Sequence, residues 1–166
     1  MAISETLLLD YDIEIGNTRR TLALIPEKDP IWKPHEKSMA IGRLALHVAR
    51  LPDFCTRILA TEEMNLATEK FPDFHFESTA HLLTTLDKSA AEAKSHLVSA
   101  SDEELRKNWR LLFGERVVVD GPRQVLYRTM FLNHMVHHRA QLGVYLRLLN
   151  IPIPGLYGPS ADEPFN

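Results

Sequence analysis

Two histidines near the C-terminal end of the chain, His134 and His138, have the spacing of a metal-binding pair. They are four residues apart in a long apolar segment, so on a helix they lie on one face, one turn apart, close enough to bind one ion. The same face continues at alternating spacings of four and three residues through Tyr127, Phe131, His134, His138, Gln141 and Tyr145. This repeat is typical of a buried helix–helix seam, so both imidazoles are predicted to point into the protein.

A third histidine, His47, lies on the inward face of another predicted helix, at the same alternation of four and three residues. A buried imidazole must satisfy both ring nitrogens. A metal ion bound by His47, His134 and His138 uses one nitrogen of each ring. The second nitrogen of a ring can donate a hydrogen bond to a side chain such as Gln141. Three ligands leave coordination positions open, as in catalytic zinc sites. A hydrogen-bonded set of core histidines is the alternative that spacing alone leaves open.

Three neutral imidazoles would leave the charge of the metal ion uncompensated. Such an ion lowers the pKa of a bound water, to about 7 in zinc examples, or stabilises a substrate thiolate. All-nitrogen ligation suits zinc, nickel, iron or copper, and we expect a divalent ion such as zinc, nickel or iron. Asp162, Glu163 and His137 are candidates for proton transfer, and Tyr157 and the two acids are expected near the pocket mouth. His137 is one residue off the seam and is therefore not a predicted ligand.

Composition excludes several classes of protein. The 166 residues fit one domain, residues 1–166, and the hydrophobic fraction of 45% is that of an ordinary globular protein. The single cysteine, Cys55, rules out an internal disulfide framework, and we find neither a signal peptide nor a membrane span, so we expect a cytoplasmic protein without membrane partners. A net charge of −3 argues against nucleic-acid binding.

One local exception to this charge balance is a stripe of arginines. Arg43, Arg50 and Arg57 recur every seven residues and so share one helix face. A solvated helix face explains such a stripe in most proteins. The alternative is a binding surface for an acidic partner, in which case the chain would be a non-catalytic module.

The pattern of apolar residues predicts an all-α fold, a four-helix bundle. Long helices are expected over about 4–25, 40–58, 78–99 and 121–149, with a kink at Pro52 and a long connection at 60–77. Ser101 and Glu104 form a capping pattern for a short helix at 102–108, and residues 109–120 suggest a small hairpin before the last helix. Asn150 is the predicted end of the last helix, and the four prolines after it predict an extended tail.

At these residues the sequence resembles the DinB-like family. Two blocks carry the resemblance: the first runs from Trp32 through Ile41-Gly42-Arg43-Leu44-Ala45-Leu46-His47. The second contains Asn133-His134, His137-His138-Arg139-Ala140-Gln141-Leu142, Tyr145-Leu146-Arg147 and the tail from Pro154 to Glu163. Ala140 stands where many members carry Gly. The match covers nearly the whole chain, including the segment around Glu14.

The resemblance implies an up-down-down-up bundle, usually a homodimer, with a divalent metal held by three histidines that map onto His47, His134 and His138. Some relatives are S-transferases or isomerases that use low-molecular-weight thiols, so we expect a small-molecule substrate, a thiol among the candidates. The leading hypothesis is a metal-dependent thiol S-transferase. The alternatives are a metal-dependent hydrolase and a non-catalytic stress-response binding module with a structural metal.

Overall fold

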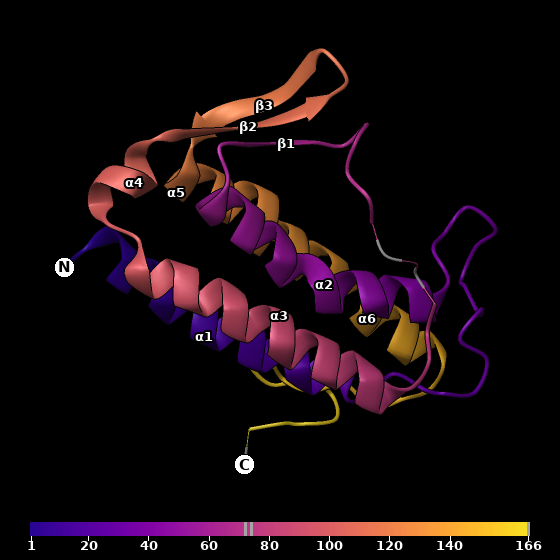
Figure 1. Cartoon of the computed structure of the whole chain (residues 1–166). Helices are drawn as coiled ribbons and strands as arrows, with labels where there is room; N and C mark the ends of the chain where they lie inside the picture. Colours follow the sequence, from indigo (N-terminus) through magenta and orange to yellow (C-terminus); the bar gives the residue numbers. More distant parts are fainter. Residues whose placement is uncertain (72, 74, 166) are drawn as a thin grey trace.

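Four long helices form the framework of the computed structural model, which describes residues 1–71, 73 and 75–165 (Figure 1). They are α1 (Ile3–Leu22), α2 (Ile41–Ala60), α3 (Thr79–Ser99) and α6 (Asn133–Leu148). A short helix, α4 (Asp102–Arg106), follows α3, and a second one, α5 (Arg123–Leu126), precedes a π-helical turn, η1 (Tyr127–Leu132). Within the described part of the chain, we find no helix both long and apolar enough to cross a bilayer.

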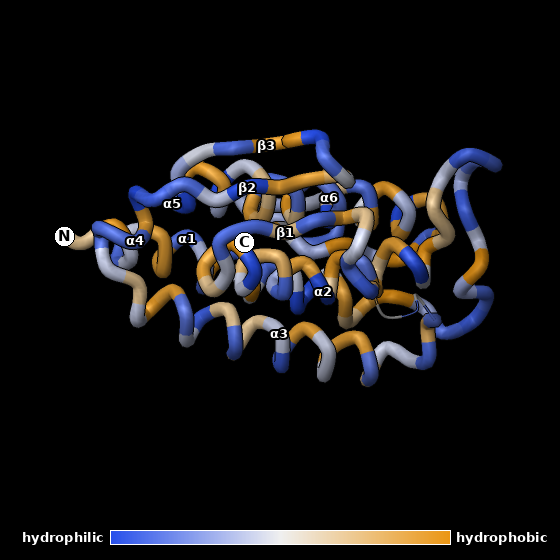
Figure 2. The backbone as a smooth tube through the Cα atoms, turned by 45° about the horizontal axis from the view of Figure 1, so that its top comes forward, coloured by the Kyte–Doolittle hydropathy of each residue, from blue (hydrophilic) through white to orange (hydrophobic). Residues whose placement is uncertain are grey.

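The long helices pack around one shared apolar core. α2 contacts both α3 and α6, α1 contacts the same two helices, and the buried apolar side chains form one cluster. Figure 2 shows hydrophobic and hydrophilic stretches alternating along α3, as expected of a helix with one buried face. α2 and α3 run in the same direction, opposite to α1 and α6, so the connection after α2 has to return along the length of α2 (Figure 1).

The ends of several helices follow from local sequence. The Ser78 hydroxyl accepts a hydrogen bond from the His81 backbone at the start of α3, and Ser101 accepts one from Glu104 at the start of α4, each at 3.1 Å. Asn150 adopts a left-handed conformation, with φ of 58°, just after α6. The capping residues predicted at Ser101 and Asn150 therefore lie where helices begin and end.

The predicted fold class, all-α, is wrong, because the chain also forms a three-stranded mixed sheet with the order β1-β2-β3. β2 (Asn108–Phe113) and β3 (Arg116–Pro122) are the antiparallel pair expected as a hairpin. The unexpected strand, β1 (Glu63–Asn65), pairs with β2 in parallel. The Asn65 side chain fixes this strand, because it donates to the Gly114 carbonyl and accepts from the Gly114 N–H, each at 3.0 Å.

The segment expected as one helix over 121–149 consists of the end of a strand followed by three helical parts. β3 extends to Pro122, α5 has only four residues, and η1 separates it from α6. A π-helical turn places more residues in each turn than an α-helix, so it rotates the next helix about its own axis. α6, which carries two of the predicted metal ligands, begins directly after this turn.

Candidate metal centre

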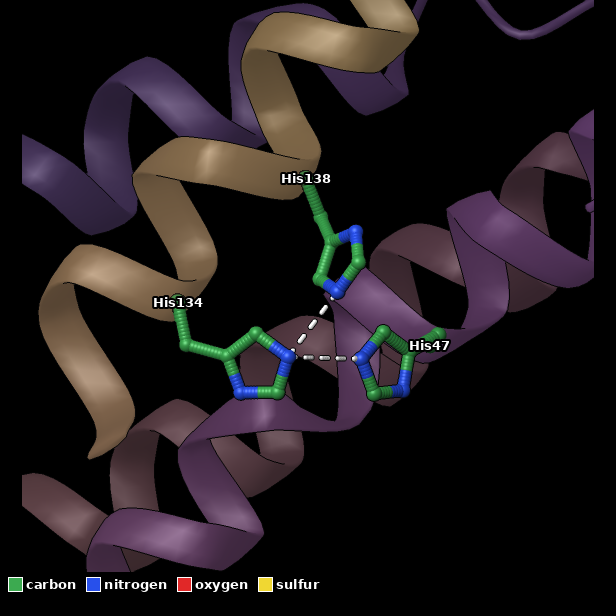
Figure 3. Close-up of side chains that lie close together, drawn as sticks. All are labelled: His47, His134 and His138. Carbon is green, nitrogen blue, oxygen red and sulfur yellow. Dashed lines mark hydrogen bonds between the residues drawn. The ribbon is translucent and has the colours of Figure 1, made fainter. Parts of the chain in front are cut away.

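Three histidines from two helices converge at one point between α2 and α6 (Figure 3). The Nε2 atom of His134 lies 3.4 Å from Nε2 of His47 and 2.9 Å from Nε2 of His138. Each of the three residues offers a ligand nitrogen within 4.8 Å of the other two, and each is partly buried. The structure therefore brings together the three histidines that the seam spacing predicted to point inward.

The separations between these nitrogen atoms are those of ligands around one metal ion. Zinc–nitrogen bonds of about 2.05 Å in a tetrahedral arrangement place ligand nitrogens roughly 3.3 Å apart. The observed separations from His134, 3.4 and 2.9 Å, lie on either side of that value. The donor set and its spacing therefore fit a divalent metal with small adjustments of the rings.

Hydrogen bonds at the far side of two rings determine where their lone pairs point. His138 Nδ1 lies 2.8 Å from Oε1 of Gln141, which can only accept, so this nitrogen carries the proton. His134 has a hydrogen bond to the backbone of Met130, and because its Nε2 faces the other histidines, the bond belongs to Nδ1. Both Nε2 atoms then present lone pairs to each other at 2.9 Å, an arrangement that a cation between them would stabilise. The exposed His137 lies behind Gln141, 3.2 Å from Nε2 of that amide.

Burial favours the neutral form of two of the three imidazoles, those of His47 and His134. It lowers the pKa of His47 to about 4, and the nearby His138, His134 and Arg43 act in the same direction. Burial also lowers the pKa of His134, together with the charge of His138, while the hydrogen bond to Met130 acts against this change. Metal ions bind only the neutral form of histidine, so at neutral pH these rings need not release a proton to bind one.

The π-helical turn η1 positions the start of α6 relative to the core. Tyr127 and Phe131 from this turn are fully buried and pack edge to face, with ring centroids 5.3 Å apart. The Tyr127 hydroxyl donates to the Leu7 carbonyl of α1 at 3.0 Å. Met130, which hydrogen-bonds His134, belongs to the same turn. The turn thus links the orientation of His134 to the packing of α6 against α1.

Two acids expected near the site are held in ion pairs of the C-terminal tail. Asp162 pairs with Arg147, and Glu163 pairs with Arg20 at 2.7 Å. The hydrogen bond from Arg147 lowers the pKa of Asp162, and bonds from the Gly155 N–H and from Arg20 lower the pKa of Glu163. Both acids therefore attach the tail to α6 and α1, and their expected role in proton transfer has no support from this placement.

Sequence reasoning missed a buried charged cluster around Arg139, the residue that follows His138 in the sequence. The Arg139 side chain is 2% exposed and forms an ion pair with Glu14 of α1 at 2.6 Å. Arg139 also donates to the Thr18 hydroxyl at 3.1 Å and to the Tyr157 hydroxyl, which itself donates to Glu14 at 2.7 Å. Tyr157, expected at the pocket mouth, thus attaches the tail to Glu14 of α1 and Arg139 of α6. Thr18 was the available signal, because a polar residue in an apolar seam requires a buried polar partner.

Two arginines of the predicted stripe contact the connection between α2 and α3. Arg57 forms an ion pair with Glu69 at 2.6 Å, and Arg50 donates to the Asp73 carbonyl at 2.8 Å. These contacts hold the connection against α2. They give the two arginines a structural role in addition to any role on a solvated surface.

Comparisons with known proteins agree on one family. A model of the DinB family matches residues 6–164. A DinB-like protein from Bacillus cereus superposes with a TM-score of 0.70 at 22% identity, over 92% of this chain and 97% of that chain. A DinB-like protein from Bacillus subtilis superposes with a TM-score of 0.69 at 17% identity, over 91% and 97%. No curated protein matches the chain. At these sequence identities, the two structures support the fold of this chain and nothing about its activity.

Proposed function

The chain belongs to the DinB family, and we propose that it binds a divalent metal through His47, His134 and His138 and uses it to activate a low-molecular-weight thiol for S-transfer. One observation carries the metal part of this proposal. Three Nε2 atoms from two helices converge within ligand distance, and the Nδ1 partners of His134 and His138 direct their lone pairs to the same point.

The residues around the site orient the His134 and His138 rings, and burial favours the neutral form of His47 and His134. Gln141 fixes the His138 ring, and the backbone of Met130 fixes the His134 ring, so the donor atoms need little reorganisation. Burial keeps His47 and His134 neutral, as their depressed pKa values indicate. A divalent ion bound here would lower the pKa of a thiol and hold the thiolate for attack.

The transfer reaction itself follows from the family resemblance. The thiolate sulfur forms a bond to an electrophilic carbon of a second substrate, and the group that leaves this carbon takes the electron pair of the broken bond. The thiol proton passes to solvent.

Metal content tests the first half of the proposal. Wild type, His138→Ala and His137→Ala are expressed in metal-replete medium, purified, and measured by inductively coupled plasma mass spectrometry. We expect stoichiometric metal in wild type and in His137→Ala, because His137 lies outside the converging set, and a near-complete loss in His138→Ala. Equal metal content in wild type and His138→Ala would contradict the proposal.

Cobalt substitution tests the thiol half and separates it from the hydrolase alternative. A thiolate bound to Co²⁺ adds a sulfur-to-metal charge-transfer band in the near ultraviolet. We expect this band when 2-mercaptoethanol is added to the Co²⁺-loaded wild type, and no band with His138→Ala. A Co²⁺-loaded protein that shows no band with any small thiol would instead favour metal-activated water, and therefore a hydrolase.

A further inference from the structure

A cavity of about 330 Å³ begins at His47 and runs along the face of α2 that the connection to α3 covers. Its walls are mainly apolar and include Leu51 and Phe54 of α2, Met64 of β1 and Phe71 of the connection. On α2 the lining extends as far as Arg57, and ten residues of helix span about 15 Å. The cavity is therefore elongated, with one end at a predicted metal ligand.

Its charged lining is predominantly cationic. Arg50, Arg57 and Lys70 contribute three positive charges, against the carboxylates of Asp53 and Glu69. Arg57 and Glu69 form an ion pair at 2.6 Å and compensate each other, so Arg50 and Lys70 stand against Asp53 and leave an excess of one positive charge. An anionic group on a ligand would find an excess of positive charge beside the apolar walls.

The dimensions suit a small molecule. Ligand pockets have volumes of roughly 300–1,000 Å³ and combine apolar walls with a few charged groups, as this cavity does. We infer that the cavity binds an elongated apolar molecule that carries an anionic group, with one end at His47, as the second substrate of the three-histidine site. Binding itself depends on the cavity alone, whereas the role as second substrate rests on the metal-dependent transfer proposed above.

Phe71 offers a test with a matched control. Its side chain lines the cavity and is 53% exposed, so Phe71→Asp should fold while placing a negative charge in the wall. Phe113 on the hairpin is 61% exposed and lies outside the cavity lining, so Phe113→Asp makes the same change elsewhere. The probe is 1-anilinonaphthalene-8-sulfonate, which is apolar and anionic, and its fluorescence is titrated with metal-free protein. We expect at least tenfold weaker binding to Phe71→Asp and unchanged binding to Phe113→Asp. Equal affinities for the two variants would overturn the inference.

The preference for an anion has its own comparison. N-phenyl-1-naphthylamine has the same aromatic framework without the sulfonate. We expect it to bind more weakly than the sulfonate to wild type, and Lys70→Ala to reduce that difference while Lys28→Ala, in the loop after α1, leaves it unchanged. If both probes bind wild type equally, the anionic part of the inference is wrong.

Coupling between metal and ligand tests the role as second substrate. His47 lines the cavity, so a Zn²⁺ ion bound by the histidines would lie at the end of the bound ligand. His134 does not line the cavity, so replacing it removes a metal ligand without changing the cavity wall. We expect Zn²⁺ to change the affinity of the sulfonate probe for wild type but not for His134→Ala, and the probe to change Zn²⁺ affinity by the same factor. Independent binding would overturn the role as second substrate. Failure of the metal proposal is recognised separately, as zero metal content with intact probe binding.

Discussion

Gln141 fixes the tautomer of His138 and therefore the direction of its free lone pair. It accepts from His138 Nδ1 and leaves Nε2 of that ring without a proton, facing His134. Without such an acceptor, an imidazole exchanges between two tautomers, and only one of them presents Nε2 to a metal. The amide is therefore as much part of the candidate site as the nitrogen donors.

Replacing Gln141 should weaken metal binding without removing a ligand. We expect Gln141→Leu to lower Zn²⁺ affinity about 10- to 100-fold, as is typical when the partner of a ligating histidine is lost. Gln141→Glu should retain the affinity, because a carboxylate accepts the same hydrogen bond. Competition with a chromophoric chelator measures both. A Gln141→Leu protein with wild-type affinity would show that the hydrogen bond has no influence on the metal.

The depressed pKa of His47 predicts a pH dependence for the metal-free protein. In the unfolded chain His47 titrates near its ordinary value of 6.5, but in the folded protein it titrates at about 4. As the pH falls from 6.5 toward 4, the unfolded state therefore binds the proton first and the free energy of unfolding decreases. Urea unfolding of metal-free protein at several pH values measures this slope. We expect a shallower slope for His47→Gln, and an unchanged slope would be inconsistent with the assignment.

Attachment of the C-terminal tail depends on two kinds of ion pair. Arg139 and Glu14 form a buried pair between α6 and α1, which the Tyr157 hydroxyl joins from the tail. Arg20 and Glu163 form an exposed pair on the same tail. Removal of one member of a buried pair leaves the other charge uncompensated, whereas solvent compensates the remaining member of an exposed pair.

Loss of Glu14 should therefore be costly. We expect Glu14→Ala to lower the free energy of unfolding by about 3 kcal/mol, because Arg139 would stay buried without its carboxylate. The matched control, Glu163→Ala, removes a carboxylate from the exposed pair between the tail and Arg20 of α1, and should have a much smaller effect. Urea unfolding of both variants provides the comparison. Similar losses would mean that Arg139 reaches solvent when its partner is removed.

Sequence periodicity predicted the convergence of the three histidines better than it predicted the fold. The inward seam depends on spacing within single helices, and this spacing is enough to place His47, His134 and His138 on inward helix faces. β1 was not predicted, because three residues are too short to show an alternating pattern and its partner β2 lies more than 40 residues away. The π-helical turn was not predicted either, since it changes the backbone hydrogen bonds of the helix without altering the order of apolar residues in the sequence.

Contacts between distant segments were the other part that sequence left undetermined. Arg139 follows His138 directly, but its burial depends on Glu14 and Thr18 of α1 and on Tyr157 of the tail. No local pattern specifies such a set of partners. The tail acids Asp162 and Glu163 were expected near the pocket mouth because no local pattern identifies their partners either. Arg147 of α6 and Arg20 of α1 hold them instead.

A metal at this site would join two helices whose ligands are far apart in sequence, with His47 and His134 separated by 87 residues. It should therefore stabilise the fold as a whole. At a free Zn²⁺ concentration a hundred times the dissociation constant, we expect the free energy of unfolding to rise by about 2.7 kcal/mol. The His137→Ala protein should gain as much as wild type, and His134→Ala should gain nothing. Urea unfolding with Zn²⁺ and with a chelator measures the gain. Equal stabilisation of wild type and His134→Ala would place the ion elsewhere on the molecule.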